Sequence, residues 1–245
     1  AEGVHGEPHP WLKNCLVLSR SGSLEELEAF QNGLFYVQDP ASRLAVLALD
    51  PEPGDRVLDM CAAPGGKSFA AAIQMRDQGE IWSCDLHPHK KTLIQKGAQR
   101  LGLTCIRPQT ADGKVRRPEW EGAFDRVLVD APCSGLGVIR KKPDIRFKDP
   151  EPLAGLPQVQ SAILDNAAGY VKPGGVLVYS TCTILERENR AVTDAFLAAH
   201  PEFSRERFLL PGPAGEVSEG QITLWPQVHG TDGFYICKLR KDGEA

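Results

Sequence analysis

The chain has 245 residues, 42% of them hydrophobic and 24% charged, and its formal net charge is −4. This composition predicts a large α/β domain, and the lack of any run of about 18 apolar residues predicts no membrane-spanning helix. The acidic balance argues against a protein that binds nucleic acid through its overall charge. Seven scattered cysteines without metal-ligand spacing argue against a metal site or a disulfide framework, so we expect reduced thiols in the cytoplasm.

The predicted elements begin with an N-terminal extension over residues 1–35 and a helix from Ala41. From residue 54 onward, short apolar segments alternate with stretches of helical periodicity. Strands separated by helices predict a mainly parallel sheet with helices on both faces, and the last strand is expected to run antiparallel. The expected strands cover residues 56–60, 81–85, 104–106, 124–130, 176–180 and 234–239. The expected helices follow residue 66 and cover about 88–101 (burying Leu93, Ile94, Ala98 and Leu101), 159–171 and 186–199.

Several chemically capable side chains fall at the carboxyl ends of these strands. Ligands of parallel sheets bind outside the carboxyl ends of the strands. Asp59, Asp85, Asp130 and Cys182 all lie at or just past such an end. We therefore expect these four residues to line one rim of the sheet.

A Gly-rich turn, Cys61-Ala62-Ala63-Pro64-Gly65-Gly66-Lys67-Ser68, follows the first expected strand. It carries only the second half of a P-loop, and no G-x-G-x-x-G is present, so both pyrophosphate-binding motifs fit poorly. A strand, a tight turn and a helix N-terminus also suit a carboxylate. Asp85, 19 residues after Gly66, is placed to hold a ribose diol, and Asp112 could reach an adenine amino group. These groups together match S-adenosylmethionine, although Asp85 could instead be a simple strand-end cap.

Two cysteines stand at strand ends, Cys133 in Asp130-Ala131-Pro132-Cys133 and Cys182 in Ser180-Thr181-Cys182. Thr183 and Glu186 have the spacing of a capping box, which predicts a helix start just after Cys182 and a thiolate favoured by the helix dipole. Such a thiolate could add to C6 of cytosine and make C5 able to take a methyl group, with Asp130 bonding the protonated ring nitrogen. The alternative is that both are buried structural cysteines.

A basic run follows the first cysteine, with five cations and one acid between Arg140 and Lys148. Such a run is either a solvated loop or a surface that contacts phosphates. Its position directly after Cys133 favours phosphate contact.

Together these segments resemble the RNA cytosine-5 methyltransferase family, and within it the bacterial group that acts on small-subunit (16S) ribosomal RNA. The resemblance covers about residues 36–240 and is carried by the sequences at 38–42, 57–67, 130–135, 140–146 and 180–182. It implies a class I S-adenosylmethionine-dependent methyltransferase with a Rossmann-like sheet of seven strands, one of them antiparallel. It also implies a catalytic domain over residues 36–245, ribosomal RNA as partner, and neither a membrane nor a metal.

The resemblance implies roles for individual residues as well. Cys182 would be the nucleophile that forms a covalent adduct with C6 of the cytosine, Cys133 would assist release, and Asp130 would act beside them. S-adenosylmethionine would be held by Cys61, Ala62, Ala63, Pro64, Gly65, Gly66, Lys67, Asp85, Asp112 and Asp130. The RNA would be contacted by Arg140, Lys141, Lys142 and Arg146.

Several alternatives remain open from the sequence. The related DNA enzymes attack with the cysteine of the Pro-Cys motif, here Cys133, and the substrate could be tRNA or DNA. A cofactor-binding protein that serves ribosome assembly without catalysis is a further alternative. Members of the bacterial group carry an additional N-terminal RNA-binding domain, and residues 1–35 could be its remnant in a fragment or a short natural form. Lys67 could contact the cofactor, orient the rim or meet an RNA phosphate.

Overall fold

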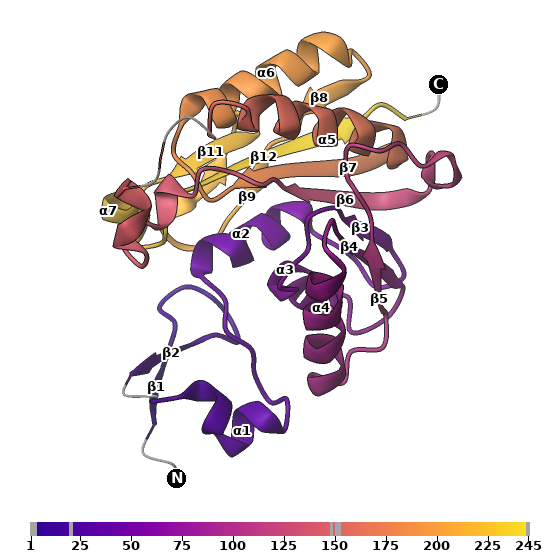
Figure 1. The fold of residues 1–245 in the computed structure, drawn as a ribbon. Coiled ribbons are helices and arrows are strands. Elements are labelled where there is room, and N and C mark those ends of the chain that lie inside the picture. The colour runs from indigo at the N-terminus through magenta and orange to yellow at the C-terminus, as the bar shows by residue number, and fades with distance from the viewer. Residues whose placement is uncertain (1–3, 20–21, 148, 150–152, 244–245) are drawn as a thin grey trace.

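The computed structural model describes residues 4–19, 22–147, 149 and 153–243, and its centre is a large mixed sheet (Figure 1). Within the described residues the sheet has eight strands in the order β11-β12-β7-β6-β3-β4-β5, and β8 pairs with β12. The parallel strands are β3 (Arg56–Asp59), β4 (Glu80–Asp85), β5 (Ile106–Thr110), β6 (Phe124–Asp130) and β7 (Val171–Thr181). β12 (Phe234–Lys241) runs antiparallel to β7. β8 (Phe203–Arg205) and β11 (Gln221–Leu224) each pair antiparallel with β12, so they run in the direction of the parallel strands.

Helices cover both faces of this sheet, as Figure 1 shows. One layer consists of α2 (Pro40–Leu49), α3 (Gly66–Gln74) and α4 (Pro88–Arg100), and the other of α5 (Leu156–Tyr170) and α6 (Arg190–Ala199). Alternation along β7 separates two cores, because Val176 and Val178 pack with the first layer while Leu177 and Tyr179 pack with the second. None of the described helices combines the length and the apolar character that a membrane span requires.

The segment before α2 lies apart from the sheet in Figure 1, beneath α2 and α4. It holds a hairpin of β1 (His5–Pro8) and β2 (Leu16–Ser19), the 3₁₀ turn η1 (Leu24–Glu26) and the short helix α1 (Glu28–Gln31). Arg100 at the end of α4 anchors it, since its Nη1 donates to the carbonyl oxygens of Phe30 (2.6 Å) and Phe35 (2.9 Å). Its guanidinium also lies 3.7 Å from the centroid of the Phe30 ring.

Several further short elements lie between or after these strands and helices. They are η2 (Pro118–Trp120), η7 (Gly212–Ala214), β9 (Phe208–Leu209), β10 (Glu216–Val217) and α7 (Pro226–His229). β9 and β10 form a separate two-stranded sheet.

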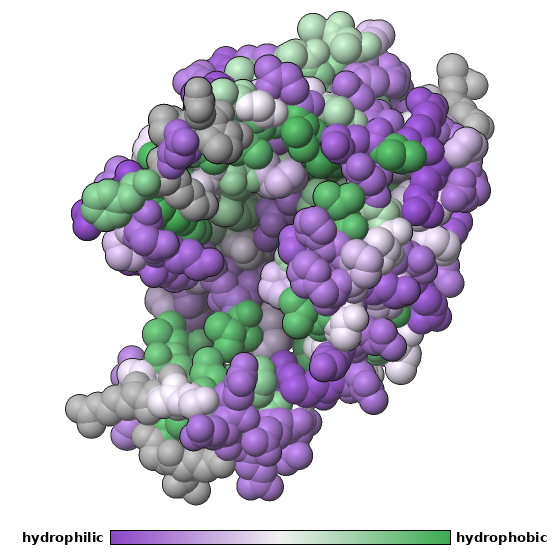
Figure 2. All heavy atoms as spheres, viewed as in Figure 1, coloured by the Kyte–Doolittle hydropathy of each residue, from purple (hydrophilic) through white to green (hydrophobic). Residues whose placement is uncertain are grey.

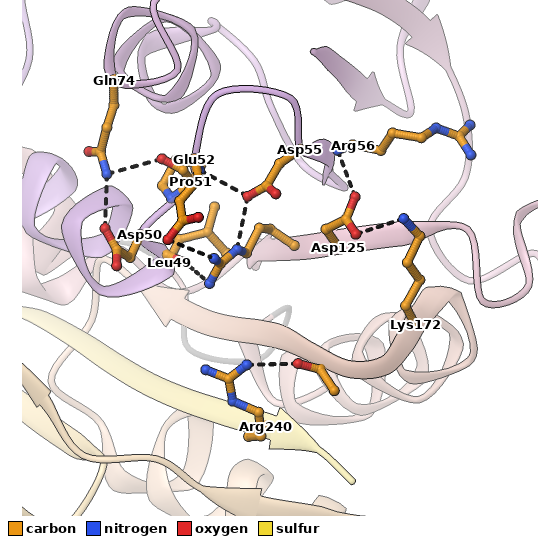
Figure 3. A network of polar contacts seen from close by, with 12 residues as sticks. Leu49, Asp50, Pro51, Glu52, Asp55, Arg56, Gln74, Asp125, Lys172 and Arg240 are labelled. Atoms are coloured by element: carbon orange, nitrogen blue, oxygen red, sulfur yellow. Dashed lines mark hydrogen bonds and ion pairs between the residues drawn. The ribbon is translucent and has the colours of Figure 1, made fainter. Parts of the chain in front are cut away.

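A polar network binds β3 to β6 at their amino ends (Figure 3). The Arg56 backbone N–H donates to Asp125 Oδ2 (2.9 Å), and Lys172 Nζ lies 2.6 Å from Asp125 Oδ1. Arg126 Nε adds an ion pair with Asp55 Oδ2 at 3.0 Å. These contacts hold β3 and β6 together at their amino ends. The loops at the carboxyl ends of the same strands therefore start from a rigid base.

The predicted fold class, with a mainly parallel sheet and helices on both faces, is confirmed. Among the described strands, the expected antiparallel strand is β12, as predicted. The sheet has eight strands rather than the predicted seven, because the short strands β8 and β11 both pair with β12. The third strand begins at Ile106 rather than 104, since Asp77 Oδ1 accepts the N–H groups of Thr104 and Cys105 (both 2.9 Å) and holds them outside the ladder.

Three helix predictions also need correction. Leu93 is 51% exposed, because α4 turns Ile94 and Ala98 toward the sheet instead. The helix expected over 159–171 ends at Tyr170, and Val171 already begins β7. The helix expected over 186–199 is divided into the 3₁₀ turn η6 (Glu186–Glu188) and α6, which begins only at Arg190.

Candidate active site

The predicted rim exists at the carboxyl ends of the parallel strands. The chain adds β4 and β5 on one side of β3 and then β6 and β7 on the other, so the chain order changes direction at β3. Hydrogen bonds extend the pairing past the strand ends, from Ala62 N–H to Cys84 O (2.7 Å) and from Ala131 N–H to Ser180 O (2.9 Å). The loops after β3, β4, β6 and β7 therefore leave the sheet side by side, as the sequence predicted for the four rim residues.

The Gly-rich loop makes a tight turn into α3. Gly65 donates its N–H to Ala62 O (2.7 Å) and has a φ of +113°, which a glycine adopts without strain. A Cβ at Gly65 would lie 2.4 Å from the Phe69 ring, so the position has no room for a side chain. The first N–H groups of α3 have no partner within the helix and are available to a carboxylate.

Asp59 is a rim residue to which the sequence analysis assigned no role in cofactor binding or catalysis. Its side chain is buried at the end of β3, and its Oδ2 accepts a hydrogen bond from Ser68 Oγ (2.7 Å). No partner for its buried Oδ1 exists among the described residues. Burial raises the pKa of Asp59 to about 7, although the Ser68 hydrogen bond and the nearby Lys67 charge oppose the rise. Its position directly before the Gly-rich loop is the signal in the sequence that points to a role at the site.

Asp85 and Asp112 lie at the ends of adjacent strands, joined by a hydrogen bond from Ala111 N–H to Asp85 O (3.0 Å). Asp85 is buried, and its Oδ1 accepts the His87 N–H (3.1 Å), so it does cap the strand end. Asp112 Oδ1 accepts the Lys114 N–H (2.9 Å). Each aspartate thus uses one carboxylate oxygen to fix its loop, which leaves the cofactor-binding role of both a prediction.

The two predicted catalytic thiols meet on the rim. The Sγ atoms of Cys133 and Cys182 are 3.3 Å apart, within hydrogen-bond distance for sulfur, and both cysteines are free thiols. Their loops are further joined by a hydrogen bond between Ser134 Oγ and Thr183 Oγ1 (2.8 Å). The remaining five cysteines, all among the described residues, are also free thiols.

The predicted helix start behind Cys182 is wrong. Leu185, not Thr183, precedes η6, and α6 begins at Arg190, so no helix dipole lies directly behind the sulfur of Cys182. Thr183 does not cap a helix because its hydroxyl is bound to Ser134 and to the Leu185 N–H (3.4 Å).

Charge and hydrogen bonding distinguish the two thiols instead. Hydrogen bonding from Cys133, helped by the charge of Lys67, lowers the pKa of Cys182 against the opposing effects of burial and Asp130. The same hydrogen bond, together with burial, raises the pKa of Cys133. Of the two thiols, Cys182 is therefore the one whose thiolate form is favoured by its surroundings.

Lys67 of the Gly-rich loop pairs with Asp130. Its Nζ lies 2.6 Å from Asp130 Oδ2, and Ser180 Oγ donates to Asp130 Oδ1 (2.8 Å). Burial favours neutral lysine, but the Asp130 carboxylate outweighs it and raises the pKa of Lys67. Of the three roles open to Lys67, orienting the rim is the one that this contact directly supports.

The basic run forms η3 (Leu136–Val138) and η4 (Pro143–Phe147) with the turn between them. Arg140 Nη2 lies 3.3 Å from Asp232 Oδ1, and Lys141 Nζ lies 2.9 Å from Asp232 Oδ2 and also pairs with Asp39. These ion pairs hold the run against α2 and the loop before β12, a role that the sequence did not reveal.

Two further cations of the run have exposed side chains. Lys142 is exposed, and the exposed Arg146 stacks on Phe147 with 4.8 Å between guanidinium and ring centroid. Lys148 lies outside the described residues. Figure 2 shows this face of the molecule hollowed between the N-terminal segment and the body, with hydrophilic side chains along the upper border and hydrophobic ones along the border formed by the N-terminal segment. RNA contact by the four named cations stays a prediction.

The fold and the rim define the class as an S-adenosylmethionine-dependent methyltransferase fold. The crystal structure of PH0851 is 34% identical in sequence with a TM-score of 0.90, covering 98% of this chain and 54% of that one. NSun6 from Pyrococcus horikoshii with SFG is 30% identical with a TM-score of 0.76, covering 91% of this chain and 57% of that one.

The family follows from sequence comparison. Residues 46–240 match the model of the 16S rRNA methyltransferase RsmB/F family, to which the chain belongs. The probable ribosomal RNA small subunit methyltransferase B of Bacillus subtilis (strain 168) is 45% identical over 99% of this chain and 56% of its own length. The ribosomal RNA small subunit methyltransferase B of Klebsiella pneumoniae (strain ATCC 700721) is 37% identical over 98% and 54%. The chain thus spans about half the length of these curated relatives.

Proposed function

We propose that this chain is the catalytic part of an enzyme that transfers a methyl group from S-adenosylmethionine to C5 of a cytosine in 16S ribosomal RNA. The observation that carries the proposal is the Cys133–Cys182 pair, with sulfur atoms 3.3 Å apart beside the Gly-rich loop. The names of the relatives as ribosomal RNA small subunit methyltransferases support the substrate class.

The residues of the rim fit S-adenosylmethionine. The first N–H groups of α3 suit its carboxylate, and Asp85 at the end of β4 suits the ribose hydroxyls. The buried Asp59 Oδ1, which lacks a partner among the described residues, marks a polar position that a ligand can satisfy. NSun6, which shares this fold, was solved with SFG, an analogue of the cofactor. When bound, S-adenosylmethionine supplies an electrophilic methyl group.

The protein's part begins with covalent activation of the base. The Cys182 thiolate forms a bond from sulfur to C6, and the electron pair of the C5=C6 bond moves toward the ring nitrogen N3, which gains a proton. Asp130 is assigned to N3, and the ammonium of Lys67, 2.6 Å from its carboxylate, supplies that proton through it. C5 then has the electron density of an enamine and takes the methyl group.

Release reverses this activation. The C5 proton leaves to solvent, the C5=C6 bond forms again, and the electron pair of the broken C6–S bond returns to Cys182 as a thiolate. The N3 proton returns to Asp130. Cys133, whose sulfur lies 3.3 Å from that of Cys182, assists this step because its S–H can stabilise the departing thiolate by a hydrogen bond.

Single substitutions of the two thiols test the proposal. With 16S rRNA and S-adenosylmethionine, Cys133→Ala is expected to accumulate a protein–RNA adduct on a denaturing gel, whereas Cys182→Ala forms none. Cys15→Ala, in the loop before β2, is the matched control and should release product as the wild type does.

Other outcomes would contradict the assigned nucleophile, the substrate or the catalytic activity. Adduct only in Cys182→Ala would make Cys133 the nucleophile, as in the DNA enzymes. Methylation of tRNA but not 16S rRNA would overturn the substrate, and neither adduct nor methylated product from the wild type would overturn catalysis by this chain.

A further inference from the structure

The loop that carries Cys182 is held from both sides by Asn189. Asn189 Oδ1 accepts a hydrogen bond from Thr181 Oγ1 (2.6 Å), and its Nδ2 donates to Thr183 O (3.0 Å). The Asn189 side chain is only 2% exposed. One buried amide therefore fixes the residues before and after the proposed nucleophile.

The loop that carries Cys133 is held in the same way through Glu188. Glu188 Oε2 accepts the Ser134 N–H (2.9 Å) and a hydrogen bond from Gln160 Nε2 (3.0 Å). The same Gln160 nitrogen donates to Pro132 O (2.9 Å). The residues before and after Cys133 are thus fixed by two side chains with no exposed surface.

Glu188 and Asn189 are consecutive, so the anchors of the two loops cannot move independently. The Glu188 carbonyl accepts a hydrogen bond from Tyr179 Oη (2.7 Å), which ties this point of the chain to the buried part of β7. Both polar atoms of the Asn189 side chain are hydrogen-bonded, and Glu188 uses Oε2 for its two hydrogen bonds, while Glu188 Oε1 is buried without a partner among the described residues.

We propose that Glu188 and Asn189 are positioning residues that set the separation and orientation of the two thiols. This inference rests on the proposed function, in which Cys133 must donate a hydrogen bond to Cys182. Neither residue contacts the sulfur atoms; each acts through the backbone that carries a thiol. A sulfur–sulfur contact of 3.3 Å is sensitive to small shifts of either loop, because a hydrogen bond weakens steeply with distance and angle.

The state of Cys182 reports on this geometry. The groups with charge or acidity that act on it are Cys133 after β6, Asp130 at the end of β6 and Lys67 in α3. Asp130 and Lys67 are fixed by their own ion pair, which Asn189 does not touch. Loosening the Cys182 loop therefore removes the stabilising hydrogen bond from Cys133 while leaving that ion pair in place.

The experiment measures the rate of Cys182 alkylation by iodoacetamide against pH in the folded protein, with modified peptides quantified by mass spectrometry. In Asn189→Ala the midpoint of this profile is expected to rise by about 1 pH unit, because the thiolate loses a hydrogen bond. Thr193→Val is the matched control: Thr193 is buried in α6, its N–H donates to Asn189 O (3.1 Å) and is kept in the variant, and its Oγ1 contacts Tyr235 Oη (2.9 Å) rather than either loop. Its profile should equal that of the wild type.

If Asn189→Ala does not fold, Thr181→Val tests the same hydrogen bond with a smaller change. Thr181→Val keeps the side-chain shape and removes only the donor to Asn189 Oδ1, and it should shift the midpoint in the same direction. Folded variants with the wild-type profile would overturn the proposal. The assay needs neither RNA nor cofactor, so failure of the chain to methylate RNA would contradict the proposed function without deciding this result.

Discussion

Lys67 and Asp130 form an ion pair that joins the Gly-rich loop to the strand leading into Cys133, with 2.6 Å between Nζ and Oδ2. Lys67 Nζ also donates to Ser42 Oγ of α2 (3.3 Å) and lies 5.4 Å from the centroid of the Phe234 ring. One ammonium group therefore connects the loop proposed for the cofactor with the residues proposed for covalent chemistry. Its charge lowers the pKa of Cys182 in addition to the hydrogen bond from Cys133.

Replacing Lys67 is expected to impair both the protonation of the ring nitrogen N3 and the formation of the Cys182 thiolate. Lys67→Met should lower the single-turnover rate of methylation by about 100-fold, because a positioned acid and a stabilising charge are lost together. The Cys182 alkylation profile should move to higher pH, since removing a positive charge disfavours the thiolate. Lys172→Met removes a comparable ion pair with Asp125 at the opposite edge of the sheet and should leave both measurements unchanged. An unaltered alkylation profile in Lys67→Met would show that the charge does not act on Cys182.

Asp59 should make the folded protein less stable as the pH rises. Its pKa in the folded chain is about 7 against an ordinary 3.8, so between these values the unfolded chain loses a proton that the folded chain keeps. Stability attributable to Asp59 is therefore lost from about pH 4 to 7. Asp59→Asn removes this cost and should be more stable than the wild type at pH 8 by about 1 to 3 kcal/mol, with no difference near pH 4.

Urea unfolding at both pH values measures the effect, and Asp125→Asn supplies the contrast. Hydrogen bonds from Lys172 and the Arg56 N–H, acting against burial, lower the pKa of Asp125, so this carboxylate stabilises the fold above its ordinary pKa. Asp125→Asn should thus lose stability at pH 8, the opposite sign. A loss of stability in Asp59→Asn at pH 8 would show that the ionised Asp59 carboxylate does not destabilise the folded protein.

The rim could be predicted from the sequence because each of its residues is marked by its own position at the end of an apolar strand segment. Asp85, Asp130 and Cys182 each follow an apolar run, and parallel strands bring their carboxyl ends to one edge. The partners of the basic run could not be predicted, because Lys141 meets Asp39 and Asp232 across 102 and 91 positions of the chain. No spacing rule connects residues so far apart.

The environment of Cys182 was predicted for the wrong reason. Thr183 and Glu186 satisfy the capping-box pattern, but the hydroxyl of Thr183 finds Ser134 on another strand's loop, and tertiary contact overrides the local preference. The lowered pKa of Cys182 is then produced by Cys133 and Lys67. Glu188 and Asn189 were missed because each acts on the loops only through side chains buried between β7, α5 and α6.

The ribose role of Asp85 can be tested separately from catalysis. Asp85→Asn should weaken binding of S-adenosylmethionine by about tenfold or more, because hydrogen bonds to a charged acceptor are stronger than those to a neutral one. Calorimetric titration measures this affinity. Asp165→Asn, an exposed position on α5 with a side chain 53% exposed, is the control and should bind as the wild type does. Equal affinity in Asp85→Asn would leave Asp85 as a strand-end cap alone.

Gly137 makes the backbone contact behind Cys182, the proposed nucleophile. Gly137 donates its N–H to Cys182 O (3.0 Å) and accepts the Gly233 N–H (2.9 Å), so it lies between two loops. A Cβ at Gly137 would stand 1.8 Å from Gly233 O and 2.8 Å from Cys182 O, distances that require the backbone to move. Gly137→Ala should cost about 1 to 3 kcal/mol in urea unfolding, as overpacking does, and should lower methylation more than the remaining folded fraction explains. At Gly155 an added Cβ meets nothing within 4 Å, so Gly155→Ala should change neither quantity. Wild-type activity in Gly137→Ala would show that the Cys182 loop tolerates displacement, and the tight positioning argued for the two thiols would then be wrong.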